Sequence, residues 1–368
     1  MKIRKTKISL LGALLSFSLA STASLQAQAT ILTSFTYTNG AFPQGDLTLI
    51  GGTLYGTTSV GGPSSYGTVF SLPVGGGTPT ILGSINGPNG NGSGTNGNGP
   101  AAGLTLSKDG TTFYGTTYYG GGARNAGVVF SMPVTGGTPT VLATFSFGLH
   151  PQADLTLSAD GTTLYGTTYS GGAFGVGTVF SLPVTGGTPT VLASFNGTNG
   201  REPTGNLTLI GSTLYGTTEI GGAFSDGVVY SLPVSGGTPT VLASLGQVAN
   251  HQANPLAGLT LSADGTTFYG TTENGGTDSS GSVFSLPVGG GTPTLLASFN
   301  GNTPGSNGGQ PVAGLTLSAD GTTLYGTTEY NGPNGYGEVF SLPTGVPEPG
   351  AAGLLLTGLF LVTMRRRR

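Results

Sequence analysis

The residues able to do nucleophilic, acid–base or metal chemistry are few and widely separated. The sequence has no Cys, so thiol chemistry, disulfides and Cys-ligated metals are excluded. Its two His residues, His150 and His251, lie outside any Ser/His/Asp arrangement or His-rich metal spacing. We expect both to be surface residues. The sequence therefore assigns no catalytic residue, metal or cofactor.

Acidic residues recur at one position of an internal repeat. Glu219, Glu273 and Glu329 each follow a copy of YGTT directly, and Asp226 and Asp278 come a few residues after the first two of them. Calcium needs oxygen ligands at about 2.3–2.6 Å. Equivalent positions in neighbouring repeat units are expected on the order of 10 Å apart, because strands within one sheet already lie about 4.8 Å apart. A solvated acidic arc is therefore favoured over an ion site.

Aromatic residues share the acid-bearing loops and give them a second kind of chemistry. Flat aromatic faces stack on apolar surfaces such as those of sugar rings, although the same side chains could instead pack against neighbouring loops. Two carboxylates that converge there could also support glycoside hydrolysis or lyase chemistry. The candidate ligand-binding residues are Tyr118, Tyr119, Arg124, Tyr169, Phe174, Glu219, Asp226, Glu273, Asp278, Glu329, Tyr330 and Tyr336.

The elements that position these residues belong to a sixfold repeat. YGTT occurs with its Tyr at positions 55, 114, 165, 215, 269 and 325, a period of 50 to 59 residues. Each unit contains four strand-like pieces bounded by Gly or Asp-Gly, such as 155–158, 163–168, 177–183 and 188–195. Six units of four strands without a helical period predict an all-β, six-bladed β-propeller over residues 30–343.

Turn chemistry and strand parity agree with this prediction. Four units join their first two strands through Asp-Gly, whereas the first and fourth units are two residues shorter at this turn. Since side chains alternate with a period of two, a two-residue deletion leaves every side chain on its original face. We therefore expect the same pairing in all six units.

The two ends of the repeat array are complementary. The sixth unit stops after its third strand, and TILTSF at 30–35 is a copy of the missing fourth strand. Pairing of this segment with 337–343 would close the ring and cover a free sheet edge. An open solenoid, which would carry differing polar caps at its ends, is the less favoured alternative.

Loops on the two faces of such a propeller differ in this sequence. The first-to-second and third-to-fourth strand loops are short and nearly uniform, whereas the second-to-third loops and the connections between blades vary widely. We call these the uniform face and the varied face. Binding residues are concentrated on loops held by a rigid scaffold, and the alternative for the varied face is tolerated drift.

Composition and the chain ends indicate export. Eight of the eleven basic residues lie near the termini, which leaves three against fourteen acidic residues between them, so nucleic-acid binding is excluded. Residues 1–29 form a basic, then apolar leader with a signal-peptidase site after Ala29. At the other end, the apolar run 351–364 would extend about 21 Å as a helix, short of a membrane core of about 30 Å.

The last segment, 344–368, resembles the PEP-CTERM sorting signal of bacterial surface proteins. It contains Pro347, Glu348 and Pro349, then the short apolar run and four Arg. The resemblance implies transient anchoring in the membrane through the C-terminal helix, processing by an exosortase-type protease and transfer to the cell surface or extracellular matrix. A simple tail anchor would place the body in the same compartment.

The body, with its repeated YGTT, VFSLP and GGTPTVL elements, resembles the Gloeo/Verruco-type YGTT repeat family of bacterial extracellular proteins. That resemblance implies export and a repeat structure but no established activity. We therefore expect a non-enzymatic module that binds extracellular polysaccharide or another surface component. A carbohydrate-active hydrolase or lyase that uses Asp and Glu of the varied face, and a purely structural surface protein, are the alternatives.

Overall fold

The computed structural model describes residues 32–86, 97–100, 102–121, 125–145, 149–246, 254–276, 278–301, 309–329 and 339–344. All of them belong to one compact unit, Ile31–Arg368. The processing residues Ala29, Pro347, Glu348 and Pro349 lie outside the described part, as do the leader and the C-terminal tail. Among the described residues, no helix is long and apolar enough to cross a membrane.

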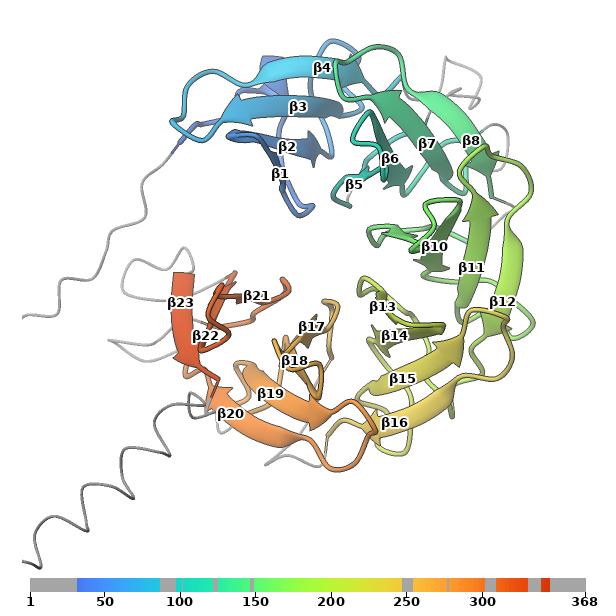
Figure 1. Ribbon diagram of the computed structural model, residues 1–368, viewed down its shortest axis with the longest axis vertical. Coiled ribbons are helices and arrows are strands. Elements are labelled where there is room, and N and C mark those ends of the chain that lie inside the picture. Colours follow the sequence, from blue (N-terminus) through green and yellow to red (C-terminus); the bar gives the residue numbers. More distant parts are fainter. Residues whose placement is uncertain are drawn as a thin grey trace, which may run out of the picture. The chain divides into compact units, whose positions relative to one another are not determined.

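The chain folds into a six-bladed β-propeller, as the repeat predicted, with the blades arranged in a ring (Figure 1). Within each blade, strands consecutive in the chain pair antiparallel, from the innermost strand outward. A short 3-10 helix, η1 (Tyr37–Asn39), precedes the first blade. The strands, blade by blade, are β1 (Thr48–Ile50), β2 (Thr53–Thr58), β3 (Thr68–Pro73) and β4 (Thr80–Ser84); β5 (Thr105–Leu106), β6 (Thr112–Thr117), β7 (Val128–Pro133) and β8 (Thr140–Thr144); β9 (Thr156–Leu157), β10 (Thr163–Thr168), β11 (Thr178–Pro183) and β12 (Thr190–Ser194); β13 (Thr208–Ile210), β14 (Thr213–Thr218), β15 (Val228–Pro233) and β16 (Thr240–Ser244); β17 (Thr260–Leu261), β18 (Thr267–Thr272), β19 (Ser282–Pro287) and β20 (Thr294–Ser298); β21 (Thr316–Leu317), β22 (Thr323–Thr327) and β23 (Val339–Pro343).

The glycine of each YGTT makes room for an aromatic side chain of the next strand. Gly166 in β10 lies directly opposite Phe180 in β11. A Cβ at Gly166 would lie 2.6 Å from Cζ of Phe180, closer than van der Waals contact permits. Because the ring fills this space, the two motifs YGTT and VFSLP depend on each other within every blade.

Strand parity is kept in the shorter first and fourth units. Thr48 pairs with Tyr55 in the first blade, just as Thr105 pairs with Tyr114 in the second, although the turn between the first two strands is two residues shorter. The prediction that the deletion leaves the pairing unchanged is therefore confirmed.

The hydrophobic core lies between blades. One cluster of buried side chains combines Phe145 from the second blade with Leu155, Leu164 and Phe180 from the third. The rings of Phe145 and Phe180 meet edge to face, with centroids 5.1 Å apart. Burial of this apolar surface, worth about 25 cal/mol per Å², is thus available only when neighbouring blades pack together.

A belt of hydroxyl bonds ties the innermost strands together. The first-strand Thr of each of the first five blades donates to a carbonyl oxygen of the next blade. Thr156 Oγ1, for example, donates to the Leu207 oxygen at 2.6 Å, and Thr208 Oγ1 donates to the Leu259 oxygen at 2.8 Å. These bonds satisfy polar groups beside the axis and fix the spacing of the blades there.

The N-terminal segment packs against the first blade. Leu32–Phe35 adopts no regular secondary structure, and among the described residues β23 pairs only with β22. The predicted pairing of this segment with β23 is therefore absent from the described pairs.

Candidate functional site

Six equivalent residues surround the axis on the varied face, and we call them the mouth ring: Ser59, Tyr118, Tyr169, Glu219, Glu273 and Glu329. Each follows the YGTT motif of its unit directly, at or just beyond the end of the second strand. The backbone N–H of each donates to the carbonyl oxygen of a residue in the preceding inter-blade connection, at 3.0–3.1 Å. The backbone is therefore uniform around the ring, whereas the side chains differ from blade to blade.

The acceptors of these bonds hold a strained backbone. They are Phe42, Gly99, His150, Glu202, Asn254 and Gln310, each followed by Pro, and all six have positive φ, between 42° and 65°. A non-glycine residue in this conformation costs of the order of 1–3 kcal/mol. Five of the six connections accept this cost, and in two of them the residue concerned, His150 or Glu202, contacts a mouth-ring side chain.

The second and third blades give the mouth its aromatic part. Tyr118 stacks on His150 with ring centroids 4.6 Å apart, and Tyr119 meets Tyr118 edge to face at 4.5 Å. The Nδ1 atom of His150 lies 2.9 Å from the Tyr118 carbonyl oxygen. His150, expected to be an ordinary surface residue, is therefore held by Tyr118 on two sides, and a half-exposed aromatic surface results.

The fourth to sixth blades give it an acidic part. Tyr169 Oη donates to Glu202 Oε2 at 3.0 Å. Burial, aided by Glu202 and Glu219, raises the pKa of Tyr169 to about 12. The pKa of Glu219 is raised by burial and by the charges of Glu202 and Glu273, and that of Glu273 by burial and Glu329. The acidic side chains are thus close enough to repel one another, as an arc along the ring.

Other predicted candidates lie away from the mouth ring or outside the described part. Phe174 is exposed in a turn whose Ala173 N–H donates to Ser194 Oγ of the outermost strand, so it lies toward the rim. Asp226 and Asp278 lie in the corresponding turns of the next two blades. Arg124, Tyr330, Tyr336 and His251 lie outside the described residues.

A second polar group lies on the axis, where the innermost strands begin. Asn206 of the fourth blade bridges two aspartates: its Oδ1 accepts from the Asp154 N–H at 2.8 Å, and its Nδ2 donates to Asp46 Oδ2 at 3.3 Å. Asp154 Oδ1 also accepts from the Gly103 N–H at 2.5 Å. The first, third and fourth blades are therefore joined across the ring by one carboxyl–amide–carboxyl group.

This axial group holds a carboxyl with unusual proton affinity. Burial, and next the charge of Asp46, raise the pKa of Asp154 to about 7. The pKa of Asp46 is also raised by burial among protein atoms, although part of the residue is exposed to solvent. A carboxyl that exchanges a proton near neutral pH is suited to general acid–base work.

The sequence carried a signal for the axial group that was missed. In each unit, the axial residue lies two positions before the first strand; these residues are Asp46, Gly103, Asp154, Asn206, Gly258 and Gly314. Glu202 and His150 were missed as mouth residues for a similar reason, since their common mark is a position just before Pro. Aligning the six units residue by residue would have identified both positions.

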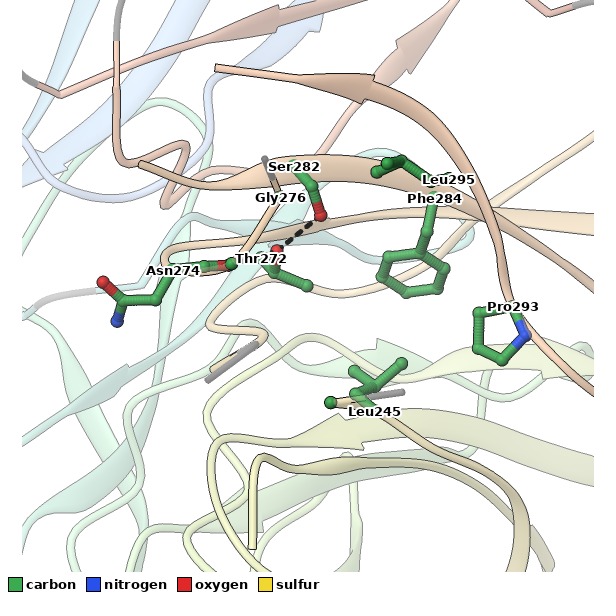
Figure 2. Close-up of a pocket in the computed structure, with 10 residues that line it drawn as sticks. Leu245, Thr272, Asn274, Gly276, Ser282, Phe284, Pro293 and Leu295 are labelled. Carbon is green, nitrogen blue, oxygen red and sulfur yellow. Dashed lines mark hydrogen bonds between the residues drawn. The ribbon is translucent and has the colours of Figure 1, made fainter. Parts of the chain in front are cut away.

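A pocket between the fourth and fifth blades has a structural origin (Figure 2). It is partly open to solvent, and Leu245, Ser282 and Phe284 are among its lining residues. Leu245 stands where Phe145 and Phe195 meet the next blade in edge-to-face pairs. Ser282 stands where Thr178 and Val228 supply a methyl group. Two side chains smaller than their counterparts therefore leave this space.

Filling the pocket is expected to stabilise the protein. Ser282→Thr retains a hydroxyl for the 2.7 Å bond with Thr272, as in the Thr168–Thr178 pair, and adds one methyl group. Each buried methylene is worth about 0.8 kcal/mol, so we expect a gain of about 0.5–1 kcal/mol, measured by urea denaturation. Ser282→Ala, which removes the bond, serves as the control and should be less stable. A Thr variant less stable than wild type would show that the space is not available.

Comparisons with known proteins identify the repeat family and show similar folds. The model of the Gloeobacter/Verrucomicrobia repeat matches residues 90–267 and 211–348. No curated protein matches the sequence. A puromycin-hydrolysing peptidase of Mycobacterium tuberculosis is similar in structure, with a TM-score of 0.50 at 14% identity over 85% of this chain and 48% of its own.

Two further solved structures are similar at lower scores. TolB of Acinetobacter baumannii has a TM-score of 0.47 at 15% identity over 78% of this chain and 62% of its own. An oligogalacturonate lyase in complex with manganese has a TM-score of 0.48 at 13% identity, over 82% and 76%. The chain thus spans about half to three quarters of the length of these three proteins. At such identities the likeness concerns the fold alone.

Proposed function

The chain belongs to the Gloeobacter/Verrucomicrobia repeat family, and we propose that its propeller is an exported surface module that binds a saccharide at the mouth ring. Family and fold give a repeat scaffold. The ligand class comes from the side chains that this scaffold displays on its varied face.

One observation carries the proposal: a single backbone position, held by the same hydrogen bond in six blades, displays aromatic residues on two neighbouring blades and carboxylates on the next three. The second and third strands on either side of this loop are nearly identical from unit to unit. Aromatic faces offer stacking surface, and carboxylates accept hydrogen bonds from hydroxyl groups. Together they match a sugar chain, which has apolar ring faces and hydroxyl edges.

Charge narrows the ligand class. Arg201 is the cation near the acidic arc in the described part of the chain, where it lowers the pKa of Glu219. Its one positive charge is outnumbered by four carboxylates, those of Glu202, Glu219, Glu273 and Glu329. This excess of negative charge repels uronate-rich or sulfated polymers and favours neutral or amine-bearing saccharides. Binding of an amine-bearing ligand should weaken as salt increases, because exposed charges are screened.

The position of the chain end supports a surface role. The described chain ends at Thr344, whose N–H donates to the Thr322 oxygen in a hairpin of the uniform face. The mouth ring lies on the opposite face. A body held through its C-terminal tail, as the resemblance to a PEP-CTERM signal implies, would therefore direct its mouth away from the anchoring surface.

Binding to a glycan array tests this proposal. The full chain, purified after export, is expected to retain neutral or amine-bearing glycans and to leave uronate-rich glycans unbound. Tyr118→Ala and Glu219→Gln should each lower affinity about tenfold, roughly 1.4 kcal/mol, and Phe174→Ala, an aromatic truncation at the rim, is the matched control. Absence of any bound glycan, or equal losses in all three variants, would contradict a mouth-ring site.

A second candidate function rests on the axial group. A carboxyl with a pKa of about 7 and a second carboxyl nearby could serve as proton donor and acceptor in a hydrolase or lyase acting on a saccharide. The full chain incubated with the glycans that it binds should then release shorter products, and Asp154→Asn should abolish release while binding remains. Glycans recovered intact after binding would contradict the hydrolase or lyase function and support the non-enzymatic binding module.

A further inference from the structure

The junction between the sixth and first blades differs from the other five. Tyr325 of the sixth blade is 45% exposed, whereas its counterpart Tyr269 is 1% exposed. On the first blade, Leu47 is 53% exposed, whereas Leu104 in the second blade is 5% exposed. Apolar residues that are buried at other junctions are therefore uncovered at this one, which we call the seam.

A free strand edge lies at the same junction. β23 pairs with β22 on one side, and no partner on its other side occurs in the described part of the chain. Val339, at the start of β23, is 67% exposed, whereas Val283 at the same place in the fifth blade is fully buried. An unpaired edge beside exposed apolar surface is a site for strand addition.

The N-terminal segment already makes the contacts with the first blade that an outermost strand of the sixth blade would make. In four blades, the last Gly of the loop between the third and fourth strands donates its N–H to the carbonyl oxygen of a Leu in the outermost strand of the preceding blade. Gly137 donates to Leu82 at 2.8 Å, for example, and Gly187 to Leu142 at 3.0 Å. In the first blade, Gly77 makes this bond to Leu32, also at 3.0 Å. Leu32 therefore stands where an outermost strand would present its Leu.

Aromatic packing repeats the same relation. Phe35 meets Phe70 of the first blade with ring centroids 4.9 Å apart and an interplanar angle of 68°. Phe145 and Phe180 meet at 5.1 Å and 67°. Two independent contacts thus place Leu32–Phe35 against the first blade as the fourth strand of a preceding blade.

We propose that Leu32–Phe35 is the fourth strand of the sixth blade and pairs antiparallel with β23, with Thr33 opposite Val339. The register follows from the other blades, in which Val69 pairs with Gly83 and Val283 with Ala297. Thr33 is the counterpart of Gly83 and Ala297 by its position after the Leu. Movement of the sixth blade toward the first completes the sheet and buries the seam.

Closure has a consequence for the two ends of the body. Leu32–Phe35 runs toward the varied face and β23 runs away from it, so pairing brings the start of the body beside the end of β23 on the uniform face. It also brings Glu329 and Ser59 together as neighbours in the mouth ring. Pairing at the seam therefore closes the ring. We expect this closure to fix the position of Glu329 relative to Ser59 in the mouth ring.

An engineered disulfide tests the register, because the natural chain has no Cys to compete. Thr33→Cys with Val339→Cys, in the full exported chain, should form an intramolecular disulfide under mild oxidation, detected by mass spectrometry of the digested protein. Val283→Cys with Ala297→Cys, an observed pair at the same position of the fifth blade, is the positive control. Thr38→Cys with Val339→Cys is the mismatched control.

Each outcome decides the proposal. A disulfide between the two thiols introduced at Thr33 and Val339 of one chain, formed to an extent near that of the positive control, supports it. Disulfides between two chains would mean that a second copy supplies the strand, which overturns it. Equal bonding in the mismatched control, or no bond between these two positions when the positive control forms, overturns the register. These readouts do not depend on any ligand and so stand apart from the proposed function.

Discussion

Replacing Asp154 by Asn is expected to stabilise the protein at pH 8 and to have little effect at pH 4. The folded-state pKa of Asp154 is about 7, above the ordinary 3.8 that the group has in the unfolded chain. Between these values the folded state binds the extra proton, so the stability of the wild type falls as pH rises through this window. Asn resembles the protonated carboxyl, whose Oδ1 accepts from Gly103, and it removes this dependence.

The gain should increase from pH 4 to pH 7 and then level off, at on the order of 2–4 kcal/mol if most of the shift is realised. Urea denaturation midpoints at pH 4, 6 and 8 measure it. Asp160→Asn is a control of opposite sign. The bond from Ser158, with others from Thr162, lowers the pKa of Asp160 to about 2, so its carboxylate stabilises the fold above pH 4. A wild type more stable than Asp154→Asn at pH 8 would contradict the raised pKa.

The axial group also shows why the sequence predicted the fold better than the site. Strand positions, turns and parity depend on residues near one another in the chain, as in the pairing of Thr48 with Tyr55. Asp46 and Asn206 are 160 residues apart and meet because the ring brings opposite blades to one axis. Alignment of the repeat units marks the two positions, but the contact between them arises only because the blades are arranged in a ring.

The mouth ring was predicted in part, less completely than the strands and turns but better than the axial group. Tyr118, Tyr169 and Glu219 could be singled out because they follow a repeated motif, and the structure places them at one backbone position. Their partners His150 and Glu202 lie in connections of unequal length, where the following Pro is the mark of the equivalent position. The rim residue Phe174 was grouped with them because it shares their loop. Its turn, however, is hydrogen-bonded to Ser194 of the outermost strand. Loop membership was therefore too coarse a criterion.

Pairs of Gly and Pro set the distance between neighbouring blades and limit what the mouth can tolerate. Gly227 directly precedes β15, the third strand of the fourth blade, and has φ 94°. A Cβ added there would lie 2.7 Å from Pro255 Cδ and 2.9 Å from the Glu219 carbonyl oxygen, and closer still to the oxygen of Thr218. Pro255 follows the strained connection residue Asn254, and Glu219 is in the mouth ring. The glycine thus lies where the fifth blade joins the mouth.

Gly227→Ala is therefore expected to destabilise the protein by about 3 kcal/mol or more, because rigid backbone and a proline ring would have to move. Gly237→Ala in the same blade is the matched control: its φ is 132°, yet nothing lies within 4 Å of the added Cβ. It carries the cost of the backbone conformation without the clash, about 1–2 kcal/mol. Urea denaturation of both variants separates the two contributions. Equal losses would mean that φ alone requires glycine at 227, whereas a larger loss in Gly227→Ala assigns the difference to blade spacing, which in turn holds Glu219 in the mouth ring.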